Sequence, residues 1–173
     1  QKETDTTLNR VTNRIDYYTV KDCIGKYYSY YSILLNPGMY YTGVSEEDLN
    51  QAQTDNAQAI YDMLDSQYIT EKGITVDNLE TNLKEIEVIT PYVTNMYVNH
   101  RTDNMDIYVV EGKIKTSITD AGENYKIILK LDLLNKTFSV MPSEYVEEKY
   151  GNFVEGQNLD IEIADSIEKN NNN

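Results

Sequence analysis

The stretch that decides the fold begins Asp106-Ile-Tyr-Val-Val-Glu-Gly-Lys-Ile-Lys115 and continues through Tyr125-Lys-Ile-Ile-Leu-Lys-Leu-Asp-Leu-Leu134 and Thr137-Phe-Ser-Val-Met-Pro142. Apolar residues alternate with polar ones here, which is the two-residue period of a β-strand. The middle segment sorts most cleanly: Tyr125, Ile127, Leu129, Leu131 and Leu133 face inward, and Lys126, Lys130 and Asp132 face mostly outward. A loop at residues 120–124 and a turn at Asn135-Lys136 join the segments, so we expect consecutive antiparallel strands.

A fourth strand precedes these three. From Val88 onward the sequence again alternates, and Pro91 stands near the strand start, where a missing amide proton is tolerated. Residues 92–98 form the clearest part of this strand. The polar run His100-Arg-Thr-Asp-Asn104 is typical of a turn, which places His100 at the surface.

Helical spacing dominates the first half of the chain. Apolar residues recur every three or four positions between Asn13 and Leu35, and Asn36-Pro37-Gly38 ends that helix. Ser45, followed by three acidic residues, is typical of the start of a second helix, which is clearest from Thr54 to Tyr68. A third, shorter helix is expected after Thr75, with apolar positions from Val76 to Ile86.

Helices followed by strands predict an α+β fold, with two to three N-terminal helices packed on one face of a curved antiparallel meander of four or more strands. We expect this domain to span residues 13–145. Residues 1–12 are expected to be a disordered or linker segment. Residues 146–173, which are acidic and end in Asn170-Asn-Asn-Asn, are expected to be a tail or linker, with an edge strand near 159–163 as an alternative.

Charge excludes some partners. The 15 basic and 29 acidic residues give a net charge of −14, which repels nucleic acid and anionic lipid heads.

The single Cys23 cannot form an internal disulfide. The chain has no run of 18 apolar residues and opens Gln1-Lys-Glu without Met, so we expect an anchor or signal segment upstream.

No catalytic, cofactor-binding or metal-binding residue is assigned from the sequence. His100, the only histidine, falls in a predicted turn, and no histidine stands near Cys23 to generate a thiolate. The acidic residues around Asp103 and Asp120 lack the spacing of a calcium loop and are better explained as turn residues. A core or boundary position is the simplest interpretation of Cys23.

Tyrosine is the least ordinary feature, because 16 of the 18 aromatic residues are Tyr. Tyr rings crowd the first helix and the connection after it, at positions 27, 28, 30, 31, 40 and 41. One interpretation is a binding surface for a protein or a peptidoglycan-like partner. The favoured one is that Tyr replaces Phe in the core and keeps its hydroxyl at the rim.

A long Tyr-lined helix, a second helix and a meander that closes with Leu131-Asp-Leu-Leu-Asn-Lys-Thr-Phe-Ser-Val140 together resemble the nuclear-transport-factor-2-like superfamily, a cystatin-like α+β cone. The resemblance covers about residues 13–142. It implies a cone that is hollow or filled by side chains. The chain also looks like the membrane-anchored extracytoplasmic domains of low-GC Gram-positive bacteria. Enzymes of the superfamily place an Asp or His and a Tyr in the cone, roles that match no residue here.

The leading functional hypothesis is a non-enzymatic binding or scaffold domain at the bacterial cell surface. The first alternative is a small-molecule-binding protein, or an isomerase- or dehydratase-like enzyme, whose cone holds a small apolar ligand. The second is a self-associating component of a cell-envelope or conjugation machine. The expected partner is therefore a protein, a small apolar ligand or a second copy of the chain. The candidate contact residues are Tyr28, Tyr31, Tyr97, Tyr108 and Tyr125.

Overall fold

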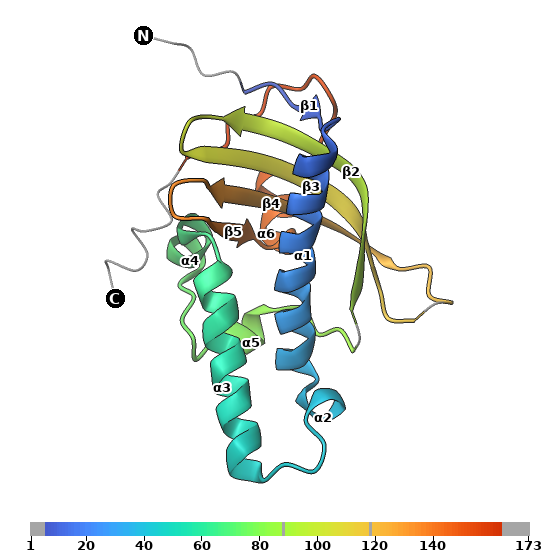
Figure 1. Ribbon diagram of the computed structural model, residues 1–173, viewed down its shortest axis with the longest axis vertical. Helices are drawn as coiled ribbons and strands as arrows, with labels where there is room; N and C mark the ends of the chain where they lie inside the picture. Colours follow the sequence, from blue (N-terminus) through green and yellow to red (C-terminus); the bar gives the residue numbers. More distant parts are fainter. Residues whose placement is uncertain (1–5, 88, 118, 164–173) are drawn as a thin grey trace.

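The computed structural model describes residues 6–87, 89–117 and 119–163, and it confirms the predicted α+β class (Figure 1). Five strands form one antiparallel sheet in the order β1-β2-β3-β4-β5, so each strand pairs with its neighbour in the sequence. The strands are β1 (Asn9–Arg10), β2 (Thr90–Arg101), β3 (Met105–Lys115), β4 (Glu123–Asp132) and β5 (Thr137–Met141).

The helices precede the meander, except for the last one. They are α1 (Arg14–Leu35), α2 (Pro37–Tyr40), α3 (Glu46–Met63), α4 (Ser66–Lys72), α5 (Leu79–Asn82) and α6 (Ser143–Tyr150). Asn13 and Ser45 cap α1 and α3, because their side chains accept hydrogen bonds from amides of the first turn. Figure 1 shows α1 crossing one face of the sheet with α3 beside it. None of the described helices is long and apolar enough to cross a lipid bilayer.

The second predicted helix is two helices. The chain leaves helical geometry at Leu64, which has ψ 141°, and Asp65 then caps α4 by accepting a hydrogen bond from the Gln67 amide. The helix predicted after Thr75 is also shorter than expected, since only residues 79–82 are helical. Hydrogen bonds between Thr75 and Asn78 form a turn there in place of a first helical turn.

Four predictions about exposure were wrong. His100 lies inside β2 opposite Ile107 and is buried, because the strand continues to Arg101. Lys130 and Asp132 were expected to face mostly outward, but they are 2% and 6% exposed. Leu133, expected to face inward, follows β4 and is 43% exposed.

The folded region extends beyond the predicted limits of 13 and 145 at both ends. Leu8 is fully buried, and β1 pairs with β2 in the segment expected to be a linker. In the expected tail, α6 packs on β4, and Phe153 and Ile161 are buried. Residues 159–163 contain no strand; a single bridge joins Asn158 to Thr7. The parts of the predicted linker and tail at residues 1–5 and 164–173 lie outside the described residues.

Candidate functional site

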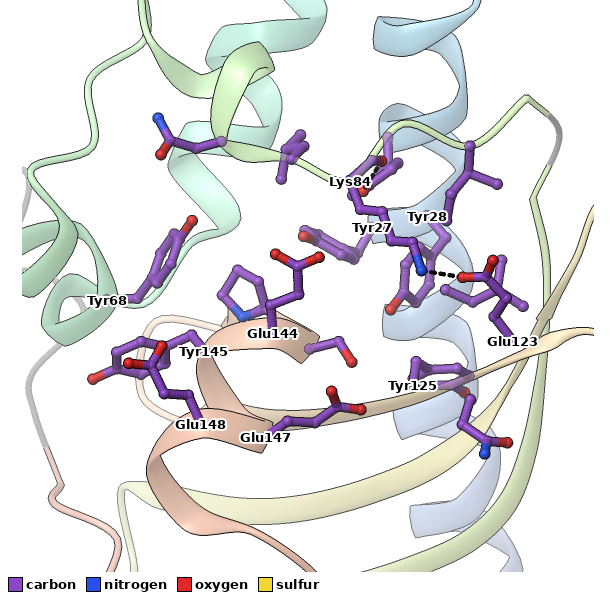
Figure 2. Close-up of a pocket in the computed structure, with 18 of the residues that line it drawn as sticks. Tyr27, Tyr28, Tyr68, Lys84, Glu123, Tyr125, Glu144, Tyr145, Glu147 and Glu148 are labelled. Carbon is purple, nitrogen blue, oxygen red and sulfur yellow. Dashed lines mark hydrogen bonds and ion pairs between the residues drawn. The ribbon is translucent and has the colours of Figure 1, made fainter.

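A cavity of about 300 Å³ opens between α1, α4, β4, α6 and the connection from α5 to β2 (Figure 2). Its position follows from the strand pairing. β5 pairs only with the second half of β4, from Ile128 onward, and α6 covers the first half, where Ser143 Oγ accepts a hydrogen bond from the Lys126 amide. Six tyrosines line this cavity, here called the tyrosine pocket: Tyr27, Tyr28, Tyr31, Tyr68, Tyr125 and Tyr145.

The tyrosines form two groups of contacting rings on the wall of the cavity. Tyr27 and Tyr28 of α1 meet edge to face with ring centroids 5.0 Å apart, and Tyr28 meets Tyr125 of β4 in the same way at 5.4 Å. Across the cavity, Tyr68 of α4 and Tyr145 of α6 lie 5.3 Å apart. Edge-to-face pairs of this kind each stabilise by about 0.5–1.5 kcal/mol beyond their buried area. Packing between four elements therefore fixes the rings.

Several of these tyrosines have a hydroxyl without a hydrogen-bond partner among the described residues, and that of Tyr125 is also buried. Within the part of the chain that the structure describes, the hydroxyls of Tyr27, Tyr28 and Tyr68 make no hydrogen bond, and the Tyr125 hydroxyl is buried and unpaired. Tyr27, Tyr28 and Tyr125 are at most 2% exposed. Burial raises the pKa of each of these three phenols, so all of them keep their protons at neutral pH. The Tyr31 hydroxyl differs, because it donates to the Lys84 carbonyl.

Acidic side chains surround the mouth of the tyrosine pocket. Four glutamates and two lysines belong to its lining. Lys84 forms an ion pair with Glu123, and Lys72 lies 3.4 Å from Glu148. The side chains of Glu144 and Glu147 of α6 have no hydrogen bond or ion pair among the described residues. The mouth therefore carries an excess of negative charge on α6.

A clasp between α4 and α6 closes one side of the tyrosine pocket. The Tyr145 hydroxyl donates to Glu71 Oε2 at 2.5 Å, and Lys149 Nζ lies 2.8 Å from Glu71 Oε1. Gln67 Nε2 donates to the Tyr145 hydroxyl at 3.2 Å. The hydrogen bond from Lys149, with the one from Tyr145, lowers the pKa of Glu71 to about 2. The charged form of Glu71 therefore holds the two helices together.

We expect Glu71→Gln to lower the free energy of unfolding by about 1 kcal/mol at pH 7, a small value because the Glu71 side chain is 45% exposed. The pKa of Glu71 is lowered in the folded state to about 2, from an ordinary value of 4.5. The contribution of Glu71 to the free energy of unfolding is therefore fully present above that ordinary pKa and is lost as the pH falls toward 2. Urea unfolding of both proteins at several pH values measures the difference.

The matched control is Glu85→Gln, because Glu85 is exposed and has no ion pair among the described residues. This variant should match the unmodified protein at every pH. A stability difference for Glu71→Gln that stays constant from pH 7 down to pH 2 would contradict the charged clasp.

The structure separates the five candidate tyrosines into two groups. Tyr28, Tyr31 and Tyr125 line the tyrosine pocket. Tyr97 and Tyr108 lie elsewhere: Arg10 stacks over the Tyr97 ring, with its guanidinium carbon 5.4 Å from the centroid, and the Tyr108 hydroxyl donates to Asp106 at 3.3 Å. Tyr28 and Tyr31 are 2% and 5% exposed, so they form no open surface for a protein partner.

Sequence reasoning missed the contribution of α6. Glu144 and Tyr145 stood at the end of the predicted domain with no helix assigned to them, and Glu147 fell in the predicted tail, because the acidic composition of the region outweighed its short apolar repeat. Two signals were present. Pro142 and Gly151 bracket the segment as helix-end residues, and Val146 and Tyr150 are four residues apart, as on one helix face.

Cys23 packs half-buried against the core on α1. Burial raises the pKa of its thiol to about 11, so the reactive thiolate form is scarce at neutral pH. In the described ranges, no group of three or more His, Cys, Asp or Glu side chains is placed to hold a metal ion. The tyrosine pocket is therefore the site on which a functional argument rests.

The order of helices and strands fits the resemblance to the nuclear-transport-factor-2-like superfamily, which stays a prediction. A shared α+β order is a property of many unrelated folds, so it identifies no family by itself. No family model, curated protein or solved structure matches this chain.

Proposed function

We propose that this protein is a small-molecule-binding domain and that its ligand occupies the tyrosine pocket. The observation that carries the proposal is the buried Tyr125 hydroxyl, which has no hydrogen-bond partner among the described residues and stands in a cavity wall with other tyrosines whose hydroxyls make no hydrogen bond. A buried polar group left unsatisfied costs about 1–3 kcal/mol. A ligand that supplies the missing partners would remove this cost on binding.

The size and lining of the tyrosine pocket agree with this proposal. Its volume of about 300 Å³ lies at the lower end of the range for ligand pockets, which is roughly 300–1,000 Å³. Aromatic faces provide contact area, and each hydroxyl both donates and accepts a hydrogen bond. The ligand should therefore be small, partly apolar and equipped with polar atoms at two or more positions.

Replacing a phenol by a phenyl ring tests the proposal. We expect Tyr125→Phe to raise the free energy of unfolding by about 1 kcal/mol, because it removes a buried unsatisfied hydroxyl. The same substitution should weaken ligand binding. Chemical unfolding measures the first effect. The second is measured by screening a library of small molecules for thermal stabilisation, with calorimetry on each compound that binds.

Tyr31→Phe is the matched control on the same cavity wall. Its hydroxyl donates to the Lys84 carbonyl, so its removal should lower stability by about 1 kcal/mol. Opposite signs for the two variants support an unsatisfied Tyr125 hydroxyl. If Tyr125→Phe is destabilising, or if no library compound binds, the proposal is wrong.

The cellular location and the two other functional hypotheses are further proposals. A cell-surface, membrane-anchored location is one of them, and fractionation of producing cells with an antibody to the domain would test it. The enzymatic alternative and the envelope-machine alternative gain no specific support from the described residues. Binding without chemistry is the simpler use of the tyrosine pocket.

A further inference from the structure

We propose that the ligand of the tyrosine pocket is an organic cation, a small molecule with an ammonium group on an aromatic or apolar body. This inference rests on the proposed function and names the class of ligand. It arises from the way in which the charges of the lining are paired.

Every positive charge of the lining is paired, whereas two of its negative charges are not. Both lysines are engaged, Lys84 with Glu123 and Lys72 with Glu148. With two of the four glutamates used in this way, the carboxylates of Glu144 and Glu147 remain without a hydrogen bond or ion pair among the described residues. An anionic ligand would have to displace a glutamate from a lysine, whereas a cation finds two carboxylates ready to accept it.

Glu144 stands where a bound ammonium group would need its counter-ion. In Figure 2 its carboxylate points into the space between Tyr68 on one side and Tyr27 on the other. Its charge acts on the aromatic wall, because it contributes to the raised pKa of Tyr68 and of Tyr31, in both cases after burial itself. It also acts on Lys84, together with Glu147. The field of this carboxylate therefore extends across the cavity.

The aromatic wall suits the same ligand. Tyrosine rings attract cations through their negative faces, most strongly where water is excluded. The oxygens of the unpaired hydroxyls of Tyr27, Tyr28 and Tyr125 are acceptors for ammonium N–H groups. The net charge of −14 on the whole chain also raises the local concentration of cations. The rings, the hydroxyls and the carboxylates of the tyrosine pocket therefore all favour a cationic ligand.

Three probes that share a phenylethyl body test the inference on the full chain: phenethylammonium, 2-phenylethanol and 3-phenylpropionate. Calorimetry or ligand-observed NMR at low salt gives their affinities. We expect phenethylammonium to bind roughly tenfold more tightly than the alcohol, and the carboxylate to bind most weakly. We expect Glu144→Gln/Glu147→Gln to reduce the preference for the ammonium group to roughly twofold.

The control variant is Glu46→Gln/Glu47→Gln, which makes the same change in net charge at the start of α3, outside the cavity lining. It should keep the preference for the ammonium probe. If it loses that preference as far as the α6 variant does, the effect belongs to the overall charge and the inference is wrong.

The two proposals fail in different ways. Equal affinities for phenethylammonium and the alcohol, or a lack of binding by phenethylammonium, overturn the cation inference. If a neutral or anionic library compound then binds and loses affinity in Tyr125→Phe, the small-molecule proposal stands without it. If no compound of any charge binds, both proposals are wrong.

Discussion

Lys130→Met is expected to lower the free energy of unfolding by about 3–5 kcal/mol, because it leaves a buried carboxylate without its counter-ion. Lys130 Nζ lies 3.2 Å from Asp65 Oδ2, and the two side chains are 1% and 3% exposed. Lys130 also donates to the Glu162 carbonyl at 2.7 Å. This one ammonium group therefore joins β4 to the start of α4 and to the C-terminal segment. Urea unfolding followed by circular dichroism measures the loss.

A double-mutant cycle separates the ion pair from simple packing. In Asp65→Asn/Lys130→Met both charges are absent, while the amide oxygen can still accept from the Gln67 amide that Asp65 caps. We expect the double variant to be more stable than Lys130→Met alone. Lys113→Met, which replaces an exposed lysine on the neighbouring strand, should change stability by less than about 0.5 kcal/mol. Additive losses in the cycle would contradict the ion pair.

Gly112→Ala is expected to lower the free energy of unfolding by about 3 kcal/mol and to disrupt the tyrosine pocket. A Cβ atom at this position would lie 1.8 Å from the Tyr92 carbonyl oxygen and 2.7 Å from the ring and hydroxyl of Tyr125. Gly112 pairs directly with Tyr125 across β3 and β4. The Tyr92 carbonyl and the Tyr125 ring occupy the space that a side chain would need, so the strands and the ring must move. Unfolding and ligand titration measure both effects.

The control for this prediction is Gly25→Ala. Gly25 lies in α1, and a Cβ atom there would meet nothing within 4 Å. Alanine in a helix interior is more favourable than glycine by about 1 kcal/mol, so this variant should be more stable than the unmodified protein. If the two substitutions have the same sign, a close approach between Gly112 and Tyr125 does not explain the result.

The sequence predicted the meander and the first helix well, because their signals are local. Asn13 and Ser45 mark helix starts by side-chain capping, and the alternation in residues 125–131 specifies a strand without reference to the rest of the chain. The favoured interpretation of the clustered tyrosines as core residues is confirmed for Tyr27, Tyr28 and Tyr31 of α1, whereas Tyr40 is 47% exposed. What the α1 tyrosines surround could not be predicted, because a cavity depends on how far apart α1, β4 and α6 pack.

The main errors have one physical cause. Alternation assumes that one face of an antiparallel sheet meets solvent, and this assumption placed Lys130 outward. Residues 146–173 were expected to be a tail or linker, with an edge strand near 159–163 as the alternative. In the structure Glu162 of that segment accepts a hydrogen bond from Lys130, and Asn99, beside the buried His100, donates to the carbonyls of Thr6 and Leu159. Long-range contacts of this kind leave no period in the sequence.

The pairing of the first and last described segments also bears on the connectivity of the fold. The Leu159 amide donates to the Thr6 carbonyl at 2.9 Å, and Leu8 exchanges hydrogen bonds with Gln157 and Gly156. Because these segments are in contact, a short linker could join them, and the chain could be opened instead at the exposed loop between β3 and β4. A circular permutant of this kind would keep every strand pairing. It should therefore also keep the tyrosine pocket, which depends on how the helices and strands pack and not on where the chain begins.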